Sequence, residues 1–310
     1  PYSPIGIRMP NRMNIGRHVL FTEGKIEVQD EGSQLLAHLV AAKRGMMVAD
    51  FCAGAGGKTL AIGALMRNTG RIYAFDVSEK RLHNLGQRLK RSGLSNLNAQ
   101  SISSETDPKL KRLNGKFDRV LVDAPCTGLG TLRRNPDLKW RQTPQDLAEL
   151  NVKQANILTR AAKLTKAGGR LIYSTCSLLR EENEQIAENF LAANPEFKLL
   201  NAAEILRQQQ INLDTGDYLK LLPHLHNTDG FFAAVFEKTD GSKPAKVATT
   251  VVAVDEAIPE TAVTEQKAKK VAAKSKVTKS KAVKETVVKE KAVKPKVVKE
   301  KIVKPKAFKE

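Results

Sequence analysis

The sequence predicts a Rossmann-like α/β fold, in which a mainly parallel sheet is covered by helices on both faces. Hydrophobic strands alternate with amphipathic helices from about residue 33 to residue 237. A glycine-rich turn at 52–57 joins one of these strands directly to a helix. Polar side chains gather where several strands end, and this is the edge at which open parallel sheets bind their ligands.

Each element follows from the spacing of its apolar residues. Leu35, Leu36 and Leu39 recur with the period of a helix that begins near Ser33, whereas the apolar run Met46–Phe51 indicates a buried strand. Similar spacing predicts further helices at 58–67, 78–92, 144–164 and 181–193. Apolar runs predict further strands at 71–76, 97–102, 117–123, 170–175, 197–200 and 231–237.

Composition divides the 310 residues into three parts. Residues 1–30 have weak periodicity, with one expected strand near Arg17–Phe21; because the chain begins without Met, we interpret them as the remnant of a larger N-terminal region. Residues 31–238 form the α/β domain. Residues 239–310 are rich in Lys, Val and Ala and end in two nearly identical decamers, so we expect a disordered tail that buries too little apolar surface to fold.

The chain is strongly basic, with 52 Lys and Arg against 33 Asp and Glu and a formal charge of +19. The tail alone contains 19 lysines and 9 acidic residues. A basic surface favours a polyanionic partner such as nucleic acid. For the tail, an excess of charge that only maintains solubility is an equally good interpretation.

The three cysteines, Cys52, Cys126 and Cys176, form no CxxC pair. They predict neither a disulfide framework nor a zinc site, and they indicate a reducing cytoplasm. We expect no metal, because the five histidines show no ligand spacing. No apolar run approaches the roughly 20 residues that span a bilayer, so we expect no membrane partner. We also expect the protein to be a cytoplasmic monomer.

The glycine-rich turn has the features of a cofactor loop. Its small residues let backbone N–H groups approach a ligand, and the helix that follows favours negative charge at its first turn. Gly57-Lys58-Thr59 also matches the end of a phosphate-binding P-loop, but that pattern requires glycine where Cys52 stands. Asp76 ends the next strand and can accept hydrogen bonds from ribose hydroxyls, which favours a nucleoside-bearing cofactor.

Two cysteines follow predicted strands, in Asp123-Ala-Pro-Cys126 and Ser-Thr-Cys176-Ser. Free cysteines usually only pack, but these two stand at strand ends beside the cofactor loop. Carbon 5 of a pyrimidine is a poor nucleophile, and a thiolate that adds to carbon 6 converts the ring into an enamine able to attack a methyl sulfonium. A second thiol can assist the later elimination, and Asp123 can stabilise charge at nitrogen 3.

These motifs resemble those of the Sun-type (RsmB-like) family of RNA 5-methylcytosine methyltransferases over about residues 26–237. The resemblance implies a class I methyltransferase fold with a seven-stranded sheet and S-adenosyl-L-methionine as cofactor. It also implies an RNA substrate, with ribosomal RNA as the first expectation. The matching segments are Val28-Gln29-Asp30 with Ser33-Gln34, the loop 52–59, Asp123-Ala124-Pro125-Cys126, Arg133-Arg134-Asn135-Pro136-Asp137 with Lys139-Trp140, Thr175-Cys176-Ser177, Glu181-Glu182-Asn183 and Asp229-Gly230-Phe231-Phe232.

The resemblance also implies residue roles. Cys176 attacks the base and Cys126 promotes product release, whereas DNA cytosine methyltransferases attack with the equivalent of Cys126. Relatives commonly have an acid where Ile102 stands, so Ser101, Ser103 or Glu105 would have to replace it. They also commonly have Ala-Pro at 54–55. The cofactor contacts that the resemblance implies are Cys52, Ala53, Gly54, Ala55, Gly56, Gly57, Lys58, Asp76 and Asp123.

The loop 133–142 contains the residues expected to contact RNA, namely Arg133, Arg134, Lys139 and Trp140. Arginines clamp phosphates and an aromatic ring can stack on a base. In the alternative interpretation, this is a solvated loop in which Trp140 only packs. Glu181-Glu182-Asn183 is interpreted as the start of a helix, where acidic residues suit the helix dipole.

The sequence therefore predicts methylation of carbon 5 of a cytosine in RNA through a covalent adduct between Cys176 and the base. The target must be unpaired or flipped out of its helix. A tRNA- or DNA-directed cytosine methyltransferase remains an alternative. So does a non-catalytic RNA-binding protein with a vestigial methyltransferase fold, which Ile102 leaves open.

Overall fold

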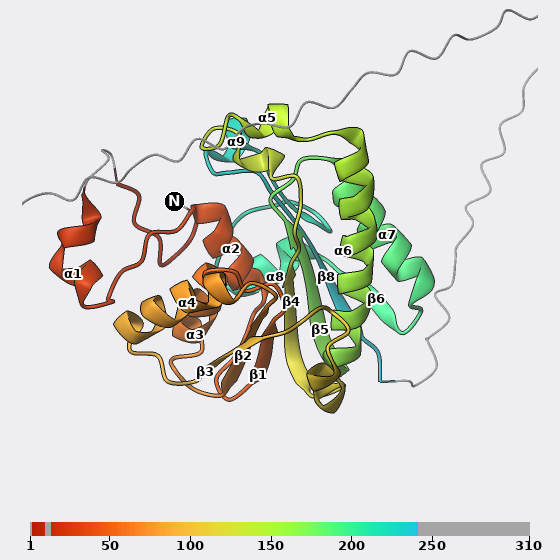
Figure 1. Cartoon of the computed structure of the whole chain (residues 1–310), viewed down its shortest axis with the longest axis horizontal. Coiled ribbons are helices and arrows are strands. Elements are labelled where there is room, and N and C mark those ends of the chain that lie inside the picture. Colours follow the sequence, from red (N-terminus) through yellow and green to blue (C-terminus); the bar gives the residue numbers. More distant parts are fainter. Residues whose placement is uncertain (1, 10–13, 241–310) are drawn as a thin grey trace, which may run out of the picture. The chain divides into compact units, whose positions relative to one another are not determined.

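One mixed sheet forms the centre of the molecule. The computed structural model describes residues 2–9 and 14–240 (Figure 1). The first five strands along the chain pair in parallel, and the last strand runs antiparallel to its neighbours. The order across the sheet is β3 (Leu97–Ser101), β2 (Arg71–Asp76), β1 (Met47–Asp50), β4 (Phe117–Asp123), β5 (Thr165–Thr175), β8 (Phe231–Lys238) and β6 (Phe197–Leu200).

The seventh position of the sheet is divided between two short strands. β5 pairs with one edge of β8, and β6 pairs with residues 235–238 on the other edge. A further strand, β7 (Leu219–Leu221), pairs with residues 231–233 of β8. The predicted α/β class and the seven positions are thus confirmed, with eight strands among the described residues.

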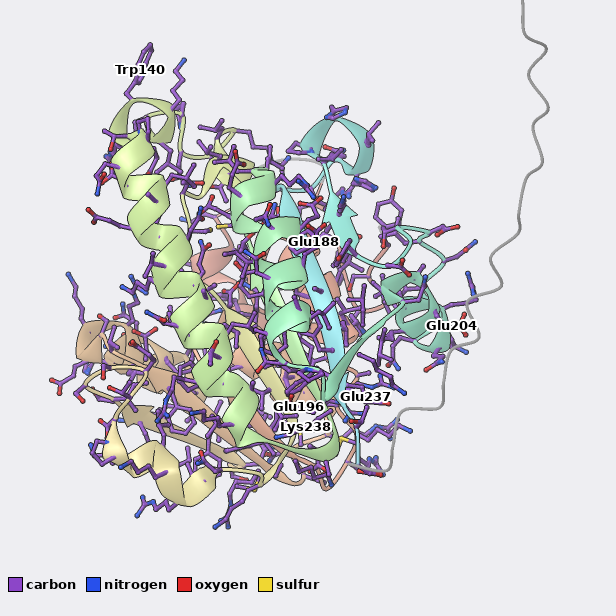
Figure 2. All side chains as sticks on the ribbon, turned by 90° about the vertical axis from the view of Figure 1, so that its right-hand side faces the viewer. Trp140, Glu188, Glu196, Glu204, Glu237 and Lys238 are labelled. Carbon is purple, nitrogen blue, oxygen red and sulfur yellow. The ribbon has the colours of Figure 1, made fainter. Side chains whose placement is uncertain are left out.

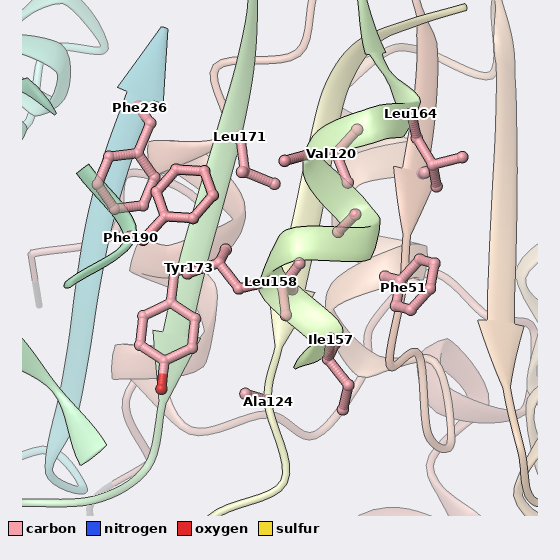
Figure 3. Close-up of a cluster of buried hydrophobic side chains, with 14 of the residues drawn as sticks. Phe51, Val120, Ala124, Ile157, Leu158, Leu164, Leu171, Tyr173, Phe190 and Phe236 are labelled. Atoms are coloured by element: carbon pink, nitrogen blue, oxygen red, sulfur yellow. The ribbon is translucent and has the colours of Figure 1, made fainter. Parts of the chain in front are cut away.

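Helices cover both faces of the sheet (Figure 1). One face packs against α6 (Pro144–Leu164) and α7 (Glu184–Ala193), and the core there includes Leu158, Phe190 and Tyr173 (Figure 3). Each large apolar side chain buried in such a core contributes about 1.5–3 kcal/mol. The other face is covered by α2 (Glu31–Leu39), α3 (Gly57–Leu65), α4 (Glu79–Ser92) and α8 (Ala202–Gln208).

Two local predictions were wrong. In place of a strand near Arg17–Phe21, the chain forms a 3-10 turn at Ile15–Arg17 and the short helix α1 (Val19–Thr22), because His18 accepts a hydrogen bond from the Leu20 N–H and caps the turn. The helix expected from residue 181 begins at Glu184, because Asn183 has a non-helical backbone with φ −112° and ψ −99°.

The predicted Lys-rich tail lies outside the described residues from 241 onward. Within residues 2–9 and 14–240, no helix is long and apolar enough to cross a membrane. The same residues contain no group of three or more His, Cys, Asp or Glu side chains placed to hold a metal ion.

Candidate active site

The two cysteines predicted to carry the chemistry lie side by side at the carboxyl edge of the sheet. Cys126 follows β4 and Cys176 follows β5, and these neighbouring parallel strands are in register, with Asp123 opposite Ser174. The two Sγ atoms are 3.4 Å apart, within hydrogen-bonding distance for sulfur. Strand pairing therefore brings together two thiols that are 50 residues apart in the sequence.

A largely buried ion pair stands beside the cysteines. Lys58 Nζ donates to Asp123 Oδ2 at 2.7 Å, and Ser174 Oγ donates to Asp123 Oδ1 at 3.3 Å. Burial alone would lower the pKa of Lys58, but the charge and hydrogen bond of Asp123 raise it, so Lys58 stays protonated. Sequence reasoning placed Lys58 only in the cofactor loop, whereas the structure also joins it to the acid expected to bind the base.

The two thiols have different electrostatic surroundings. The hydrogen bond between the sulfurs lowers the pKa of Cys176, and Lys58 also lowers it, against the opposing effects of burial and Asp123. The same hydrogen bond, burial and the charge of Glu182 raise the pKa of Cys126 well above its usual range. These opposite directions favour the thiolate form at Cys176 over the thiolate form at Cys126.

The loop between β1 and α3 is shaped for the close approach of a ligand. Gly54 and Gly56 have positive φ angles of 55° and 81°. A Cβ on Gly56 would lie 2.0 Å from Leu85, whereas the space around Gly54 is open within 4 Å. Asp76 accepts hydrogen bonds from the N–H groups of Gly54 at 2.8 Å and Ser78 at 2.7 Å. Asp76 thus shapes the loop, while each of its oxygens keeps a second lone pair for a ligand.

One carboxylate oxygen at the start of this loop has no partner among the described residues. Asp50 Oδ2 accepts a hydrogen bond from Thr59 Oγ1 at 2.7 Å, but the buried Oδ1 has none. Burial raises the pKa of Asp50 to about 7, although Thr59 acts to lower it. An unpaired buried acceptor is costly, so this oxygen suits a donor such as the ammonium group of an amino acid. Sequence reasoning noted Asp50 only as a strand end.

Two other residues near the loop pack against the apolar core. Burial, together with the charges of Asp123 and Asp50, raises the pKa of Cys52 far above its usual range, which disfavours its thiolate form. Ile102, which follows β3, is 3% exposed and packs in the same core as Phe75. Ser103, one of the suggested replacements for an acid there, is held by Asp107, to which its N–H and hydroxyl donate.

The two arginines predicted to contact RNA already have carboxylate partners. Arg133 pairs with Asp229 at 2.5 Å and with Asp30 at 3.1 Å, and Arg134 pairs with the same two acids at 2.7 and 2.8 Å. Asp30 also caps α2 by accepting from the Gly32 N–H at 2.9 Å. This network joins three of the motifs quoted above, a structural role that sequence reasoning missed.

The other two residues of the expected RNA-contact loop project outward. Trp140 is 80% exposed on the short helix α5 (Leu138–Arg141), and Figure 2 shows it pointing away from the rest of the fold. Lys139 Nζ lies 4.9 Å from the centroid of the Trp140 ring. A large exposed aromatic ring beside a cation is unusual for a packing residue. The interpretation of Trp140 as a packing plug is therefore wrong.

Sequence reasoning also missed the position of Glu182 and Asn183. Both are buried between the loops that carry the two cysteines. The motif was noticed, but it was interpreted as a helix start, and the helix begins only after it. A signal was available in the sequence, because two acids and an amide follow the Cys176 motif within seven residues.

Comparisons with known proteins agree with this geometry. The family model described as 16S rRNA methyltransferase RsmB/F matches residues 37–237. The chain is 41% identical over 218 residues to the Probable ribosomal RNA small subunit methyltransferase B of Synechocystis sp. (strain ATCC 27184 / PCC 6803 / Kazusa), a match that covers 70% of this chain and 49% of that protein.

Solved structures with similar folds come from Pyrococcus horikoshii. A methyltransferase homolog protein is 33% identical with a TM-score of 0.61, covering 74% of this chain and 73% of its own. NSun6, described as a crystal structure with SFG, is 29% identical with a TM-score of 0.63, covering 73% and 56%.

The chain spans about half the length of the curated relatives it matches, 49% and 50% for two of them. The family match nevertheless covers every strand of the described sheet apart from the last residue of β8. It also contains both cysteine motifs and the cofactor loop. The chain therefore belongs to the 16S rRNA methyltransferase RsmB/F family.

Proposed function

We propose that this chain transfers a methyl group from S-adenosylmethionine to carbon 5 of a cytosine in ribosomal RNA, through a covalent bond between Cys176 and the base. The observation that carries the proposal is the 3.4 Å contact between the Cys126 and Cys176 sulfurs beside Lys58 and Asp123. An amine-methylating enzyme has no use for such a thiol pair. The names of the curated relatives support ribosomal RNA as the substrate.

Cys176 acts first, as a thiolate. Its sulfur adds to carbon 6 of the cytosine, and the ring electrons move towards carbon 5 and nitrogen 3. Asp123 accepts a hydrogen bond from the exocyclic amino group of the amidine edge, and the ammonium group of Lys58, which donates to Asp123 at 2.7 Å, supplies the positive charge that balances the charge developing on the ring. The ring then carries a nucleophilic carbon 5.

The adduct must be released after methylation. The proton on carbon 5 leaves to solvent, the electron pair re-forms the ring double bond, and the carbon–sulfur bond to Cys176 breaks. The S–H of Cys126 stabilises the departing Cys176 thiolate by restoring the hydrogen bond seen at 3.4 Å. Without Cys126 the adduct should persist.

S-adenosylmethionine supplies the electrophilic methyl group. The residues of the β1–α3 loop fit this cofactor, because open space lies over Gly54 and Asp50 Oδ1 has no donor. Asp50 would accept from the cofactor's ammonium group, and Asp76 from its ribose hydroxyls. The buried Ile102 offers only an apolar contact to the adenine.

The RNA would be held at the same edge of the sheet. Trp140 is free to stack on a base, and Lys139 is placed to neutralise a phosphate. Arg133 and Arg134 remain 39% and 55% exposed despite their ion pairs, so their outer N–H groups can still reach phosphates.

The proposal is tested with wild type, Cys176→Ala and Cys126→Ala, each incubated with S-adenosylmethionine and ribosomal RNA, transfer RNA or DNA. We score 5-methylcytosine by mass spectrometry and protein linked to nucleic acid on denaturing gels. Wild type should methylate ribosomal RNA. Cys176→Ala should lose activity at least about 1,000-fold and form no adduct, since the covalent step is removed. Cys126→Ala should accumulate the covalent complex.

Other results would change the assignment. Loss of the adduct only in Cys126→Ala would make Cys126 the nucleophile, as in DNA cytosine methyltransferases. Methylation of transfer RNA or DNA alone would replace the substrate. RNA binding without 5-methylcytosine, together with no binding of S-adenosylmethionine by calorimetry, would favour the non-catalytic alternative.

A further inference from the structure

Glu182 is a charged residue with 0% exposure, and neither the proposed chemistry nor a helix start explains it. It lies in the 3-10 turn Arg180–Glu182, between the loop after β5 and α7. Burying a carboxylate is costly unless donors surround it. The hydrogen bonds of the Glu182 carboxylate therefore indicate which segment of the chain this residue holds in place.

Those contacts reach the loop that carries Cys126, either directly or through Gln154 on α6. Glu182 Oε1 accepts from the N–H of Thr127 at 2.9 Å and from Gln154 Nε2 at 2.9 Å, and Oε2 accepts from Thr127 Oγ1 at 2.5 Å. Gln154 Nε2 also donates to the Pro125 carbonyl at 2.9 Å. Glu182 is thus bonded directly to the residue after Cys126, and through Gln154 to the residue before it.

The next residue holds the other cysteine loop. Asn183 Oδ1 accepts from Thr175 Oγ1 at 2.5 Å, and its Nδ2 donates to the Ser177 carbonyl at 3.1 Å. The Thr127 and Ser177 hydroxyls are also 3.2 Å apart, which links the two loops directly. Two consecutive residues therefore clamp the neighbours of both sulfurs and set their separation.

We propose that Glu182 is a positioning residue that gives the two cysteines different roles, because its buried carboxylate fixes the Cys126 loop against the Cys176 loop and places a negative charge on the Cys126 side of the pair. Three donors point at this carboxylate, which suits its ionised, acceptor-only form. A negative charge beside a thiol disfavours the thiolate. In agreement, the charge of Glu182 contributes to the raised pKa of Cys126.

The other groups around the sulfurs give the same asymmetry. Lys58 favours the thiolate of Cys176, against Asp123 and burial. On the Cys126 side, Tyr173 donates its hydroxyl to the Glu182 carbonyl at 2.5 Å, and burial raises the pKa of this phenol, so it brings no charge. Among the charged side chains that shift these two pKa values most, Glu182 acts on Cys126, whereas Lys58 and Asp123 act on Cys176.

The test measures thiol reactivity and needs no methyl transfer. Wild type, Glu182→Gln and the matched control Glu181→Gln, which changes the exposed neighbouring acid, are alkylated with iodoacetamide from pH 5 to pH 10. Labelling of Cys126 and Cys176 is followed separately by peptide mass spectrometry. Glu182→Gln keeps the shape but removes the charge, so the Cys126 midpoint should fall by about one pH unit. The preference for labelling Cys176 at pH 7 should fall about tenfold.

Unchanged profiles in a folded Glu182→Gln protein would overturn the proposal, as would an equal shift in Glu181→Gln. If Glu182→Gln does not fold, the single-thiol proteins decide: Cys126 in Cys176→Ala should titrate at higher pH than Cys176 in Cys126→Ala, and equal midpoints would refute the asymmetry. Only the catalytic consequence of this positioning role rests on the proposed function. A failure to form 5-methylcytosine with the asymmetry intact would refute the function and leave the positioning role standing.

Discussion

At the scale of single residues, the buried carboxyl group of Asp50 lowers the stability of the fold when it is ionised. Its carboxyl group is buried, with one oxygen bonded to Thr59 and the other without a partner. Burial favours the neutral form and raises its pKa to about 7, from 3.8 in a solvated chain. The folded protein therefore holds this proton more tightly than the unfolded chain does.

This difference makes stability depend on pH. The contribution of the Asp50 proton is fully present below about pH 4 and is lost as pH rises towards 7, at a cost of up to about 4 kcal/mol. Asp50→Asn should thus be more stable than wild type in urea unfolding at pH 8 without cofactor. The advantage should shrink as pH falls towards 5. Parallel stability curves for the two proteins across this range would contradict the raised pKa.

At the scale of elements, Asp30 connects segments that are far apart in the chain. It caps α2 and accepts from Arg133, Arg134 and the Asp229 N–H, which lie more than 100 residues downstream. Its side chain is only 12% exposed, so solvent weakens these charges less than at an open surface. The network thus holds the start of α2, the loop 133–142 and the start of β8 together.

Asp30→Ala should lower the free energy of unfolding by about 2–3 kcal/mol, because a helix cap and two ion pairs are lost together. The matched control is Glu204→Ala, which breaks an exposed pair with Arg207 and should change stability by less than about 0.5 kcal/mol. Urea unfolding of both variants checks this. Equal effects would show that the Asp30 network is no stronger than a surface ion pair.

At the scale of the whole molecule, charge is distributed over both the domain and the tail. The 19 lysines and 9 acids of residues 239–310 supply more than half of the net charge of +19. Each phosphate contact adds to the salt dependence of RNA binding. We therefore expect the tail to strengthen binding without selecting the base.

Truncation after residue 240 should weaken RNA binding and flatten its dependence on salt, while the methylated position stays the same. The cut keeps the hydrogen bond from the Thr239 N–H to the Glu196 carbonyl at 2.7 Å. A full-length protein with tail lysines changed to Gln is the control for length and should behave like the truncated one. A changed target position, or identical salt slopes, would show that this interpretation of the tail is mistaken.

The sequence by itself determined the alternation of strands and helices, the cofactor loop and the pairing of Cys126 with Cys176 at one edge. These are local properties: hydrophobic period and turn residues specify each element, and parallel strands necessarily end at the same edge. The failures were also local in origin. Near Arg17–Phe21 weak periodicity allowed a strand to be predicted where a capped turn forms.

Only the tertiary structure decided which polar side chains meet. Lys58 is hydrogen-bonded to Asp123, 65 residues away in the sequence. Glu182 is hydrogen-bonded to Thr127 at a separation of 55 residues, and Arg134 to Asp30 at a separation of 104. No spacing rule links such positions, because their contacts depend on how loops from different strands pack above the sheet. That packing also sets the charges around each sulfur, and so it gives two chemically identical thiols different electrostatic surroundings.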